Sequence, residues 1–264
     1  MTEPTLYDRI GQSYVASRAA DPRIVAEIMR LLDLPAGAVI ADIGAGTGNY
    51  ANALAAEGYR VEAIEPSATM RDQAAAHPGV TWHAGTAEAI PLPDRSVDGC
   101  VAVLAIHHFR ALEAALAEMR RIAVGGPIVV FTFDPREGQP FWFGEYFPEI
   151  EQQDFEIFPP IAEIVAALAE QADEAPQVTV FPLPDDLRDR FMLAGWNRPE
   201  LYFDPTFRAN TSGFAKADPA TVERGLARLR EDVTSGAWDV RHGDMRTMAS
   251  FDAGYRFVSC RMRG

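Results

Sequence analysis

Apolar and polar positions follow two different periods along the first half of the chain. Five short segments have the apolar pattern of strands, at 38–43, 60–64, 80–83, 97–104 and 128–133. Apolar residues between them recur three or four positions apart, which predicts helices; one such stripe is Leu112, Leu116, Met119 and Ile122. Strands that alternate with helices indicate a parallel sheet, and right-handed crossovers place helices on both of its faces. We therefore expect a doubly wound α/β fold with its ligand at the carboxyl ends of the strands.

Capping residues mark where the helices begin. Asp21 followed by Pro22 is typical of a helix start, and the apolar residues that follow predict a helix that packs on the sheet and ends at 35–37. Ser67 caps a second predicted helix, which we expect to end at 77–79. Between these two helices, the glycine turn 44–48 joins a strand to a helix rich in small residues.

The second half of the chain loses the strict alternation. Aromatic residues crowd 141–158, and a helix at 161–169 and a sixth strand at 178–181 follow. The stretch 185–253 is predicted to be mostly helical, and a seventh strand covers 255–262. We interpret the whole chain, 1–264, as one domain in which 136–254 forms helical and aromatic inserts around the sixth strand.

Composition narrows the possible partners. The 264 residues carry a net charge of -14, and nucleic-acid-binding proteins need clustered basic side chains, so we expect a small-molecule partner and no nucleic acid. Cys100 and Cys260 lie in apolar runs and are predicted to be core residues in a reducing compartment. Neither a secretory signal nor a membrane span is recognisable, so we expect a cytoplasmic protein without membrane contact, either a monomer or a homodimer.

The glycine turn narrows the choice of ligand. Glycines let the backbone approach a ligand closely, but a dinucleotide fingerprint requires a third glycine where Asn49 stands, and no Walker lysine follows. Asp42, directly before the turn, would repel a pyrophosphate and favour a cationic ligand. Glu65, at the end of the second strand, can accept hydrogen bonds from both ribose hydroxyls of a nucleoside, a role that it could equally play for NAD. Taken alone, Glu65 would be interpreted as a solvated loop acid.

Four segments together resemble the class I S-adenosylmethionine (SAM) dependent methyltransferases. They are VIADIGAGTGNY, VEAIEPSATM, GTAEAIPLPDRSVDGCVAVLAIHHF and ALAEMRRIAVGGPIVVFTF, which occur in this order between residues 39 and 134. Within this superfamily the chain is similar to the small-molecule branch that includes the ubiquinone and menaquinone biosynthesis methyltransferases. The resemblance implies a Rossmann-like, seven-stranded, mostly parallel sheet with an antiparallel last strand. It also implies a SAM-binding core at 38–134, an N-terminal helical flap at 1–35 and a substrate cap at 136–254.

The resemblance also implies roles for individual residues in binding SAM, whose product is S-adenosylhomocysteine (SAH). Asp42, Gly44 and Gly46 would line the methionine part, and Glu65 would bind the ribose. Pro66, Ser67 and Met70 would pack near the adenine ring, with Thr86 and Ala87 at its edge. Many relatives carry Asp where this chain has Thr86, which predicts weaker cofactor binding. Residues resembling the flap are Tyr7, Asp8, Tyr14 and Arg18, of which Arg18 would bind the methionine carboxylate.

Candidates for the chemistry itself are fewer. His107 and His108 follow the fourth strand, where His107 is either a general base or a packing residue beside the cofactor. The aromatic cluster at 141–158 could be core, pocket wall or both. We interpret the acids Glu145, Glu149, Glu151 and Asp154 as a solvated face and expect no metal.

The predicted activity is transfer of the SAM methyl group, by in-line displacement, to an O, N, S or C atom of a small, partly apolar molecule. One alternative is a non-catalytic SAM-binding regulator, in which side chains from 141–214 would fill the acceptor pocket. A nicotinamide-dependent oxidoreductase is a second alternative, which the glycine spacing and Asp42 disfavour.

Overall fold

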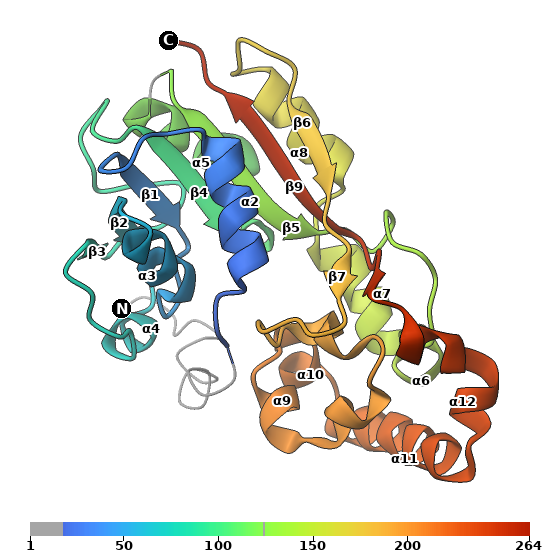
Figure 1. Ribbon diagram of the computed structural model, residues 1–264. Helices are drawn as coiled ribbons and strands as arrows, with labels where there is room; N and C mark the ends of the chain where they lie inside the picture. Colours follow the sequence, from blue (N-terminus) through green and yellow to red (C-terminus); the bar gives the residue numbers. More distant parts are fainter. Residues whose placement is uncertain (1–17, 124) are drawn as a thin grey trace.

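The sheet predicted from the sequence is present, with the predicted strand count and directions. The computed structural model describes residues 18–123 and 125–264. Its main sheet has the order β3-β2-β1-β4-β5-β9-β6 (Figure 1), and its only strand antiparallel to both neighbours is β9. The strands are β1 (Val39–Ile43), β2 (Arg60–Ile64), β3 (Val80–His83), β4 (Gly99–Val103), β5 (Pro127–Phe133), β6 (Gln177–Val180) and β9 (Tyr255–Arg261). The fold class is therefore confirmed.

Helices cover both faces of this sheet. On one face lie α2 (Pro22–Leu32) and α3 (Asn49–Ala56), and on the other α5 (Leu112–Ile122) and α8 (Ile161–Ala169) (Figure 1). Alternate residues of the strands divide between two hydrophobic clusters, one under each pair of helices, because successive strand side chains point to opposite faces. The strand order reverses between β1 and β4, the position where doubly wound sheets bind ligands.

Local sequence explains where α2 begins and what it buries. The side chain of Asp21 accepts a hydrogen bond from the Arg23 amide, which leaves Pro22 at the first helical position. Ile24 and Ile28 are fully buried against the sheet. Burial of each such side chain stabilises the fold by about 1.5–3 kcal/mol. The predicted α2 helix is therefore confirmed, including its packing face.

The helix that follows Ser67 is shorter than predicted. Ser67 does cap it, through a hydrogen bond from the Met70 amide, but α4 covers only Ala68–Asp72. The Ala75 carbonyl accepts a hydrogen bond from the Asn52 side chain at 3.0 Å, so it is drawn into a tertiary contact. This contact, together with the proline at 78, replaces the last predicted helical turns with irregular backbone.

The inserts around β6 form a helical cap beside the sheet, at the carboxyl ends of its parallel strands (Figure 1). Its helices are α6 (Phe143–Tyr146), α7 (Pro148–Ile157), α9 (Pro205–Ala209), α10 (Ser212–Lys216), α11 (Pro219–Ser235) and α12 (Ala237–His242). Its short 3₁₀ turns are η3 (Met192–Gly195), η4 (Pro199–Phe203) and η5 (Gly243–Thr247). The sequence did not predict the short antiparallel pair of β7 (Leu183–Pro184) and β8 (Ser250–Phe251). This pair joins the two ends of the segment 183–251.

Aromatic side chains form the core of the cap. Trp142, Trp196, Tyr202 and Trp238 are fully buried, and the indole of Trp142 donates a hydrogen bond to the Trp196 carbonyl at 2.7 Å. This core is continuous with the hydrophobic cluster beneath α2 and α3. Most of the aromatic residues at 141–158 are therefore core residues. The cap and the sheet share one core instead of folding around two.

Gly225 permits the close contact between α11 and the chain at Tyr146. A Cβ atom at this position would lie 2.4 Å from the Tyr146 carbonyl oxygen and 2.8 Å from the Phe147 ring. Alanine has the better helix propensity by about 1 kcal/mol, but overlap with a backbone atom forces the elements apart. We expect Gly225→Ala to lower the free energy of unfolding by about 1–3 kcal/mol in urea denaturation.

The matched control for this prediction is Gly243→Ala. The nearest atom to a Cβ there is the Asp239 Cβ at 3.7 Å, and the backbone of Gly243 is helical. This substitution should leave the free energy of unfolding unchanged or raise it by up to about 1 kcal/mol. Equal effects of the two substitutions would contradict the packing argument.

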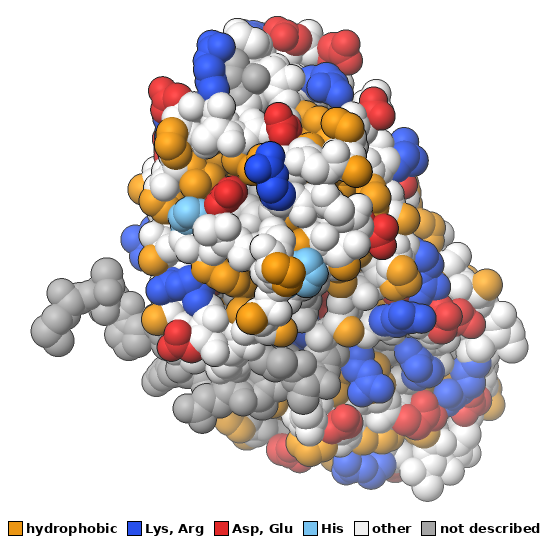
Figure 2. All heavy atoms as spheres, turned by 60° about the vertical axis from the view of Figure 1, so that its left-hand side comes forward, with side chains coloured by type: hydrophobic (Ala, Val, Ile, Leu, Met, Phe, Trp, Pro, Cys, Tyr) orange, Lys and Arg blue, Asp and Glu red, His pale blue; other side chains and the backbone are white. Residues whose placement is uncertain are grey.

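Surface and cysteine chemistry agree with the composition. Figure 2 shows basic side chains over the cap with acidic ones among them, and several form ion pairs, such as Arg246 with Glu200 at 2.8 Å. Burial raises the pKa of the Cys100 thiol and raises that of Cys260 to about 11, so both remain thiols as predicted. Over residues 18–123 and 125–264, no helix has the length and apolar character needed to cross a membrane.

Candidate functional site

A cavity of about 370 Å³ lies at the carboxyl ends of β1, β2, β4 and β5, between the sheet and the cap. This volume is within the range of small-molecule sites, about 300–1,000 Å³. The sheet contributes the glycine turn, the end of β2, the loop at 85–88 and the turn after β4. The cap side contributes Asp154, Phe158, Phe191, Met192, Asn210, Thr211, Ser212 and Lys216. The cap therefore lines the cavity without filling it.

The glycine turn adopts a backbone that other residues rarely take. Gly44 and Gly46 have φ values of +78° and +58°, in the left-handed region. A Cβ on Gly44 would lie 2.6 Å from the Cβ of Ala105, whereas a Cβ on Gly46 would meet only the Met70 methyl group, at 3.6 Å. Gly44 thus lets the turn approach β4, and Gly46 leaves open space on the cavity side.

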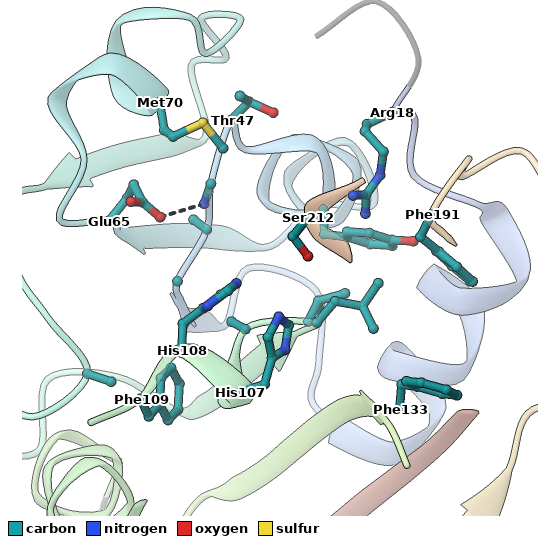
Figure 3. Close-up of a pocket in the computed structure, with 18 of the residues that line it drawn as sticks. Arg18, Thr47, Glu65, Met70, His107, His108, Phe109, Phe133, Phe191 and Ser212 are labelled. Atoms are coloured by element: carbon teal, nitrogen blue, oxygen red, sulfur yellow. Dashed lines mark hydrogen bonds between the residues drawn. The ribbon is translucent and has the colours of Figure 1, made fainter. Parts of the chain in front are cut away.

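Glu65 connects the turn to the end of β2. One carboxylate oxygen accepts a hydrogen bond from the Gly46 amide at 2.9 Å (Figure 3), and the other accepts one from the Ser67 amide at 2.8 Å. The side chain is buried and lines the cavity. Glu65 therefore lines the cavity and also fixes the shape of the glycine turn.

Asp42 lies at the end of β1 and is buried, but it is not among the residues that line the cavity. Burial, followed by the nearby negative charge of Glu65, raises the pKa of Asp42 to about 7. A cation bound in front of the turn would stabilise the ionised form. The prediction that Asp42 lines the ligand differs from the structure, because its side chain is buried behind the turn; a charge preference exerted from there stays a prediction.

Of the residues predicted to lie near adenine, all but Ser67 line the cavity; Ser67 is buried and caps α4 instead. Pro66, Met70, Thr86 and Ala87 all line the cavity near Glu65. The sequence analysis missed Glu88, which also lines it and accepts a hydrogen bond from the Arg110 amide at 2.6 Å. A carboxylate is therefore present in this loop, two positions after Thr86.

Arg18 also lines the cavity, where its guanidinium forms a two-pronged ion pair with the buried carboxylate of Asp189. The Tyr50 hydroxyl donates to the same carboxylate at 2.9 Å. Asp189 therefore joins the start of the described chain to α3 and to the cap, a connection the sequence did not suggest. Tyr14, Tyr7 and Asp8 lie outside the described residues.

The two histidines project from the turn after β4, the 3₁₀ turn η2 (Ile106–His108) (Figure 3). Leu104, just before it, has a φ of +52°, an unusual backbone conformation for leucine that redirects the chain at the cavity wall. The ring of His107 packs at a tilt against Phe158, with centroids 4.2 Å apart, and against His108 at 3.9 Å. These contacts match the packing interpretation of His107.

The pKa of His107 also supports the packing interpretation. Burial, with smaller contributions from His108 and Lys216, lowers the pKa of His107 well below 6.5. The pKa of His108 falls to about 4, again mainly through burial. Both rings are neutral near pH 7 and bind protons weakly, whereas an efficient base has a pKa near the working pH. Nδ1 of His107 is buried and has no hydrogen-bond partner in the described chain.

Asp154 corrects our interpretation of the acidic residues. Glu145 and Glu149 are exposed as expected, but the Asp154 residue is only 5% exposed and its side chain lines the cavity. Burial, then the charge of Glu151, raises its pKa to about 8, although Lys216 opposes the shift. The helical spacing of Ile150 and Asp154 on α7 was the available signal, because it places both residues on the face that packs inward.

In the described ranges, no group of three or more His, Cys, Asp and Glu side chains is arranged to hold a metal ion.

The two ends of the cavity are lined by different kinds of side chain. Glu65 lies at one end, Phe133 and Phe191 lie towards the other, and His107 and His108 lie between them (Figure 3). The geometry suits a nucleoside at the first end and an apolar molecule with a few polar groups at the second.

Comparison with known families and structures points to one class of protein. Residues 41–131 match a family described as "Methyltransferase domain". The crystal structure of a putative methyltransferase from an antibiotic biosynthesis pathway of Anabaena variabilis superposes with a TM-score of 0.90. The two chains are 46% identical, and the match covers 93% of this chain and 99% of the other.

Curated relatives match over shorter stretches. The ubiquinone/menaquinone biosynthesis C-methyltransferase of Rubrivivax gelatinosus is 37% identical over 100 residues, which are 37% of this chain and 40% of the relative. The malonyl-[acyl-carrier protein] O-methyltransferase of Yersinia pestis is 32% identical over 127 residues, 48% of each chain. The chain thus spans about half the length of these relatives or less.

Proposed function

Because this chain belongs to the class I SAM-dependent methyltransferases, we propose that it transfers the methyl group of SAM to an O, N, S or C atom of a small, partly apolar molecule. The observation that carries this proposal is the single cavity that has the glycine turn and Glu65 at one end and cap side chains at the other. A cavity of this kind can hold a cofactor and an acceptor together. A regulator that only bound SAM would not need the second end.

The residues at the first end fit SAM. Glu65 would hold the ribose, the open backbone at Gly44 and Gly46 would accommodate the methionine part, and Met70 and Thr86 would border the adenine. Asp42, behind the turn, favours a cationic ligand. Arg18 would reach the methionine carboxylate from its place beside Asp189. Tyr14 remains part of this proposal as a residue of the N-terminal flap.

When bound, SAM supplies a methyl group on a positively charged sulfur. A bond forms between the acceptor atom and the methyl carbon while the carbon–sulfur bond breaks, and its electron pair leaves on sulfur in SAH. The task of the chain is to hold the acceptor in line and to exclude water. Well-oriented intramolecular reactions have effective molarities of about 10⁵–10⁸ M, so positioning supplies most of the rate.

Asp154 takes the proton of an O–H or N–H acceptor. It is a buried carboxylate on the cavity wall, and no other residue in the described chain forms a hydrogen bond or ion pair with its side chain. Its pKa of about 8 is close to the optimum for a general base near neutral pH. The proton passes from the acceptor to Asp154 and then to solvent. His107, which has the lowered pKa, packs beside the reactants and contributes a hydrogen bond through Nδ1.

The proposed organisation has an N-terminal flap at 1–35, a SAM-binding core at 38–134 and a substrate cap at 136–254. Two helices serve the sheet as well: α2 belongs to the flap segment and α8 to the cap segment, and both pack on strands. The acceptor is a small molecule and not a nucleic acid, which the net charge of -14 supports. The protein acts in the cytoplasm as a monomer or homodimer, and its two free cysteines fit a reducing compartment.

Incubation with SAM labelled in the methyl group tests this function. A panel of small phenols, amines, thiols and carboxylic acids should include at least one compound that gains the label, with one SAH formed for each methyl transferred. Protein that binds SAH but transfers no label to any acceptor class would favour the non-catalytic regulator. Thermal stabilisation by NADH and not by SAM would favour the oxidoreductase.

A further inference from the structure

Lys216 is the only lysine in the chain. All 23 other basic residues are arginines, so the general preference of this protein for arginine does not account for the residue at 216. The single lysine lies at the end of α10 and lines the acceptor end of the cavity. An ammonium is a compact point charge on a flexible stem, whereas a guanidinium is a wide planar fork. A lysine ammonium can therefore pair with a single anionic group without the planar fit that a guanidinium favours.

The charge of Lys216 reaches the groups proposed for the chemistry. It lowers the pKa values of His107 and His108 and opposes the rise in the pKa of Asp154, so its ammonium lies within electrostatic range of all three. Partial burial lowers the pKa of Lys216 itself, and Asp154 opposes that shift.

Lys216 and the carboxyl group of Asp154 both line the cavity, yet they do not pair with each other. No hydrogen bond or ion pair joins either side chain to any residue within 18–123 and 125–264. Packing of α10 against α7 keeps their backbones close, because Gly213 contacts Ile150 across this interface. The Nδ1 atom of His107 is a further polar atom without a partner in the described chain. Polar groups left open in one cavity provide recognition sites for a ligand.

Aromatic rings line the space between these polar groups. Phe158 lies between His107, at a centroid distance of 4.2 Å, and Phe133, at 5.0 Å. Tyr255 continues this wall, 4.9 Å from Phe133. These rings are tilted or edge-on to one another, and together they give the cavity an aromatic wall against which an apolar ring can pack.

We propose that the methyl acceptor is a flat, largely apolar molecule that carries an acidic group, and that Lys216 binds this group. This inference rests on the proposed function and names the substrate class of the same site. The anion of the acceptor lies against the Lys216 ammonium, its rings lie against Phe133 and Phe158, and its nucleophile faces Asp154. Lys216 is therefore a specificity-determining residue, and Asp154 remains the proton acceptor.

The single lysine also makes a direct test possible. Reductive methylation with ¹³C-formaldehyde labels the Lys216 ammonium and the N-terminal amine only, and it retains their charge. The two NMR signals titrate separately, since an α-amine has a pKa of about 7.7–8 and a lysine one of about 10.4. The probes are 2-naphthoate and its neutral isostere naphthalene-2-carboxamide, each titrated into the SAH-loaded protein.

We expect 2-naphthoate to shift the Lys216 signal and to bind about fivefold more tightly than the carboxamide, since Lys216 is exposed and its pairing is partly screened. In unlabelled protein, measured by calorimetry, this preference should persist in Lys216→Arg and disappear in Lys216→Gln. The matched control is Arg224→Gln, which removes one positive charge from the exposed face of α11. Arg224→Gln should leave the preference unchanged.

Two results would overturn the inference: equal affinity for the two probes, or a preference for 2-naphthoate that survives in Lys216→Gln. An unperturbed Lys216 signal at millimolar 2-naphthoate counts as the first of these. Calorimetry with SAH on the same sample separates this failure from failure of the proposed function. If the protein binds SAH but does not discriminate between the probes, the proposed function stands and the inference about Lys216 fails. If it discriminates between the probes but does not bind SAH, only the anion site stands.

Discussion

Replacement of Glu65 by Gln should lower the affinity for SAM about 100-fold. The carboxylate would accept hydrogen bonds from ribose hydroxyls, and hydrogen bonds to charged groups contribute about 1.5–3 kcal/mol each. It already accepts bonds from the Gly46 and Ser67 amides at 2.9 and 2.8 Å, so the substitution also loosens the glycine turn. A loss of roughly 3 kcal/mol corresponds to about 100-fold in the dissociation constant.

Isothermal titration of the Glu65→Gln variant with SAM and with SAH measures this effect. The matched control is Glu62→Gln, which removes the same charge from the same strand, where Glu62 contacts His83 at 2.6 Å outside the cavity. Glu62→Gln should bind SAM as the unaltered protein does. An unchanged dissociation constant in folded Glu65→Gln protein would show that the nucleoside does not bind at the end of β2.

Replacement of Asp154 by Asn should lower turnover about 10²- to 10⁴-fold, the usual contribution of a general base. The same variant should be more stable than the unaltered protein at pH 8, by about 1–3 kcal/mol, because a buried and unpaired acid is costly. A purely structural residue would lose stability on substitution. The combination of lower turnover with higher stability is therefore specific to a functional acid.

The raised pKa of Asp154 sets the direction in which the free energy of unfolding changes with pH. The pKa of Asp154 is about 8 in the folded protein and ordinarily 3.8, so its contribution to stability is complete below pH 3.8 and is lost as the pH rises through 8. Asp154→Asn should therefore gain stability relative to the unaltered protein over this range, measured by urea denaturation. Turnover needs the ionised carboxylate and should rise through about pH 8.

The control for the Asp154 prediction is Glu149→Gln, an exposed acid in the first turn of the same helix. It should change neither the pH profile of turnover nor the pH dependence of the free energy of unfolding. Turnover in Asp154→Asn within twofold of the unaltered protein, with the acceptor found in the labelling screen, would remove Asp154 from the mechanism.

The sheet and the cofactor end could be predicted because their determinants are local. A strand, a turn and a helix are each specified by a few adjacent residues, as at Gly44 and Gly46, where the left-handed backbone requires glycine. Glu65 could be placed because the end of a parallel strand always faces the same edge of the sheet. These elements are therefore where the sequence predicted, although the helix after Ser67 and the fourth strand are shorter.

The acceptor end could not be predicted in the same way, because it is assembled from distant segments. Asp154 is surrounded by other acids in the sequence, and only the packing of α7 against the rest of the cap buries it. Arg18 and Asp189 are 171 positions apart and meet through the tertiary fold. Lys216 stands out in the composition, but its importance depends on the cavity beside it. Spacing along the chain carries no information on such contacts.

The central claim is that the cavity beside Glu65 binds SAM, and calorimetric titration with SAM and SAH tests it most directly, since it needs no acceptor. We predict one-to-one binding of both ligands, with dissociation constants in the micromolar range for the unaltered protein and a loss of about 100-fold in Glu65→Gln. Absence of heat and of thermal stabilisation with either ligand, in protein shown to be folded, would contradict the account.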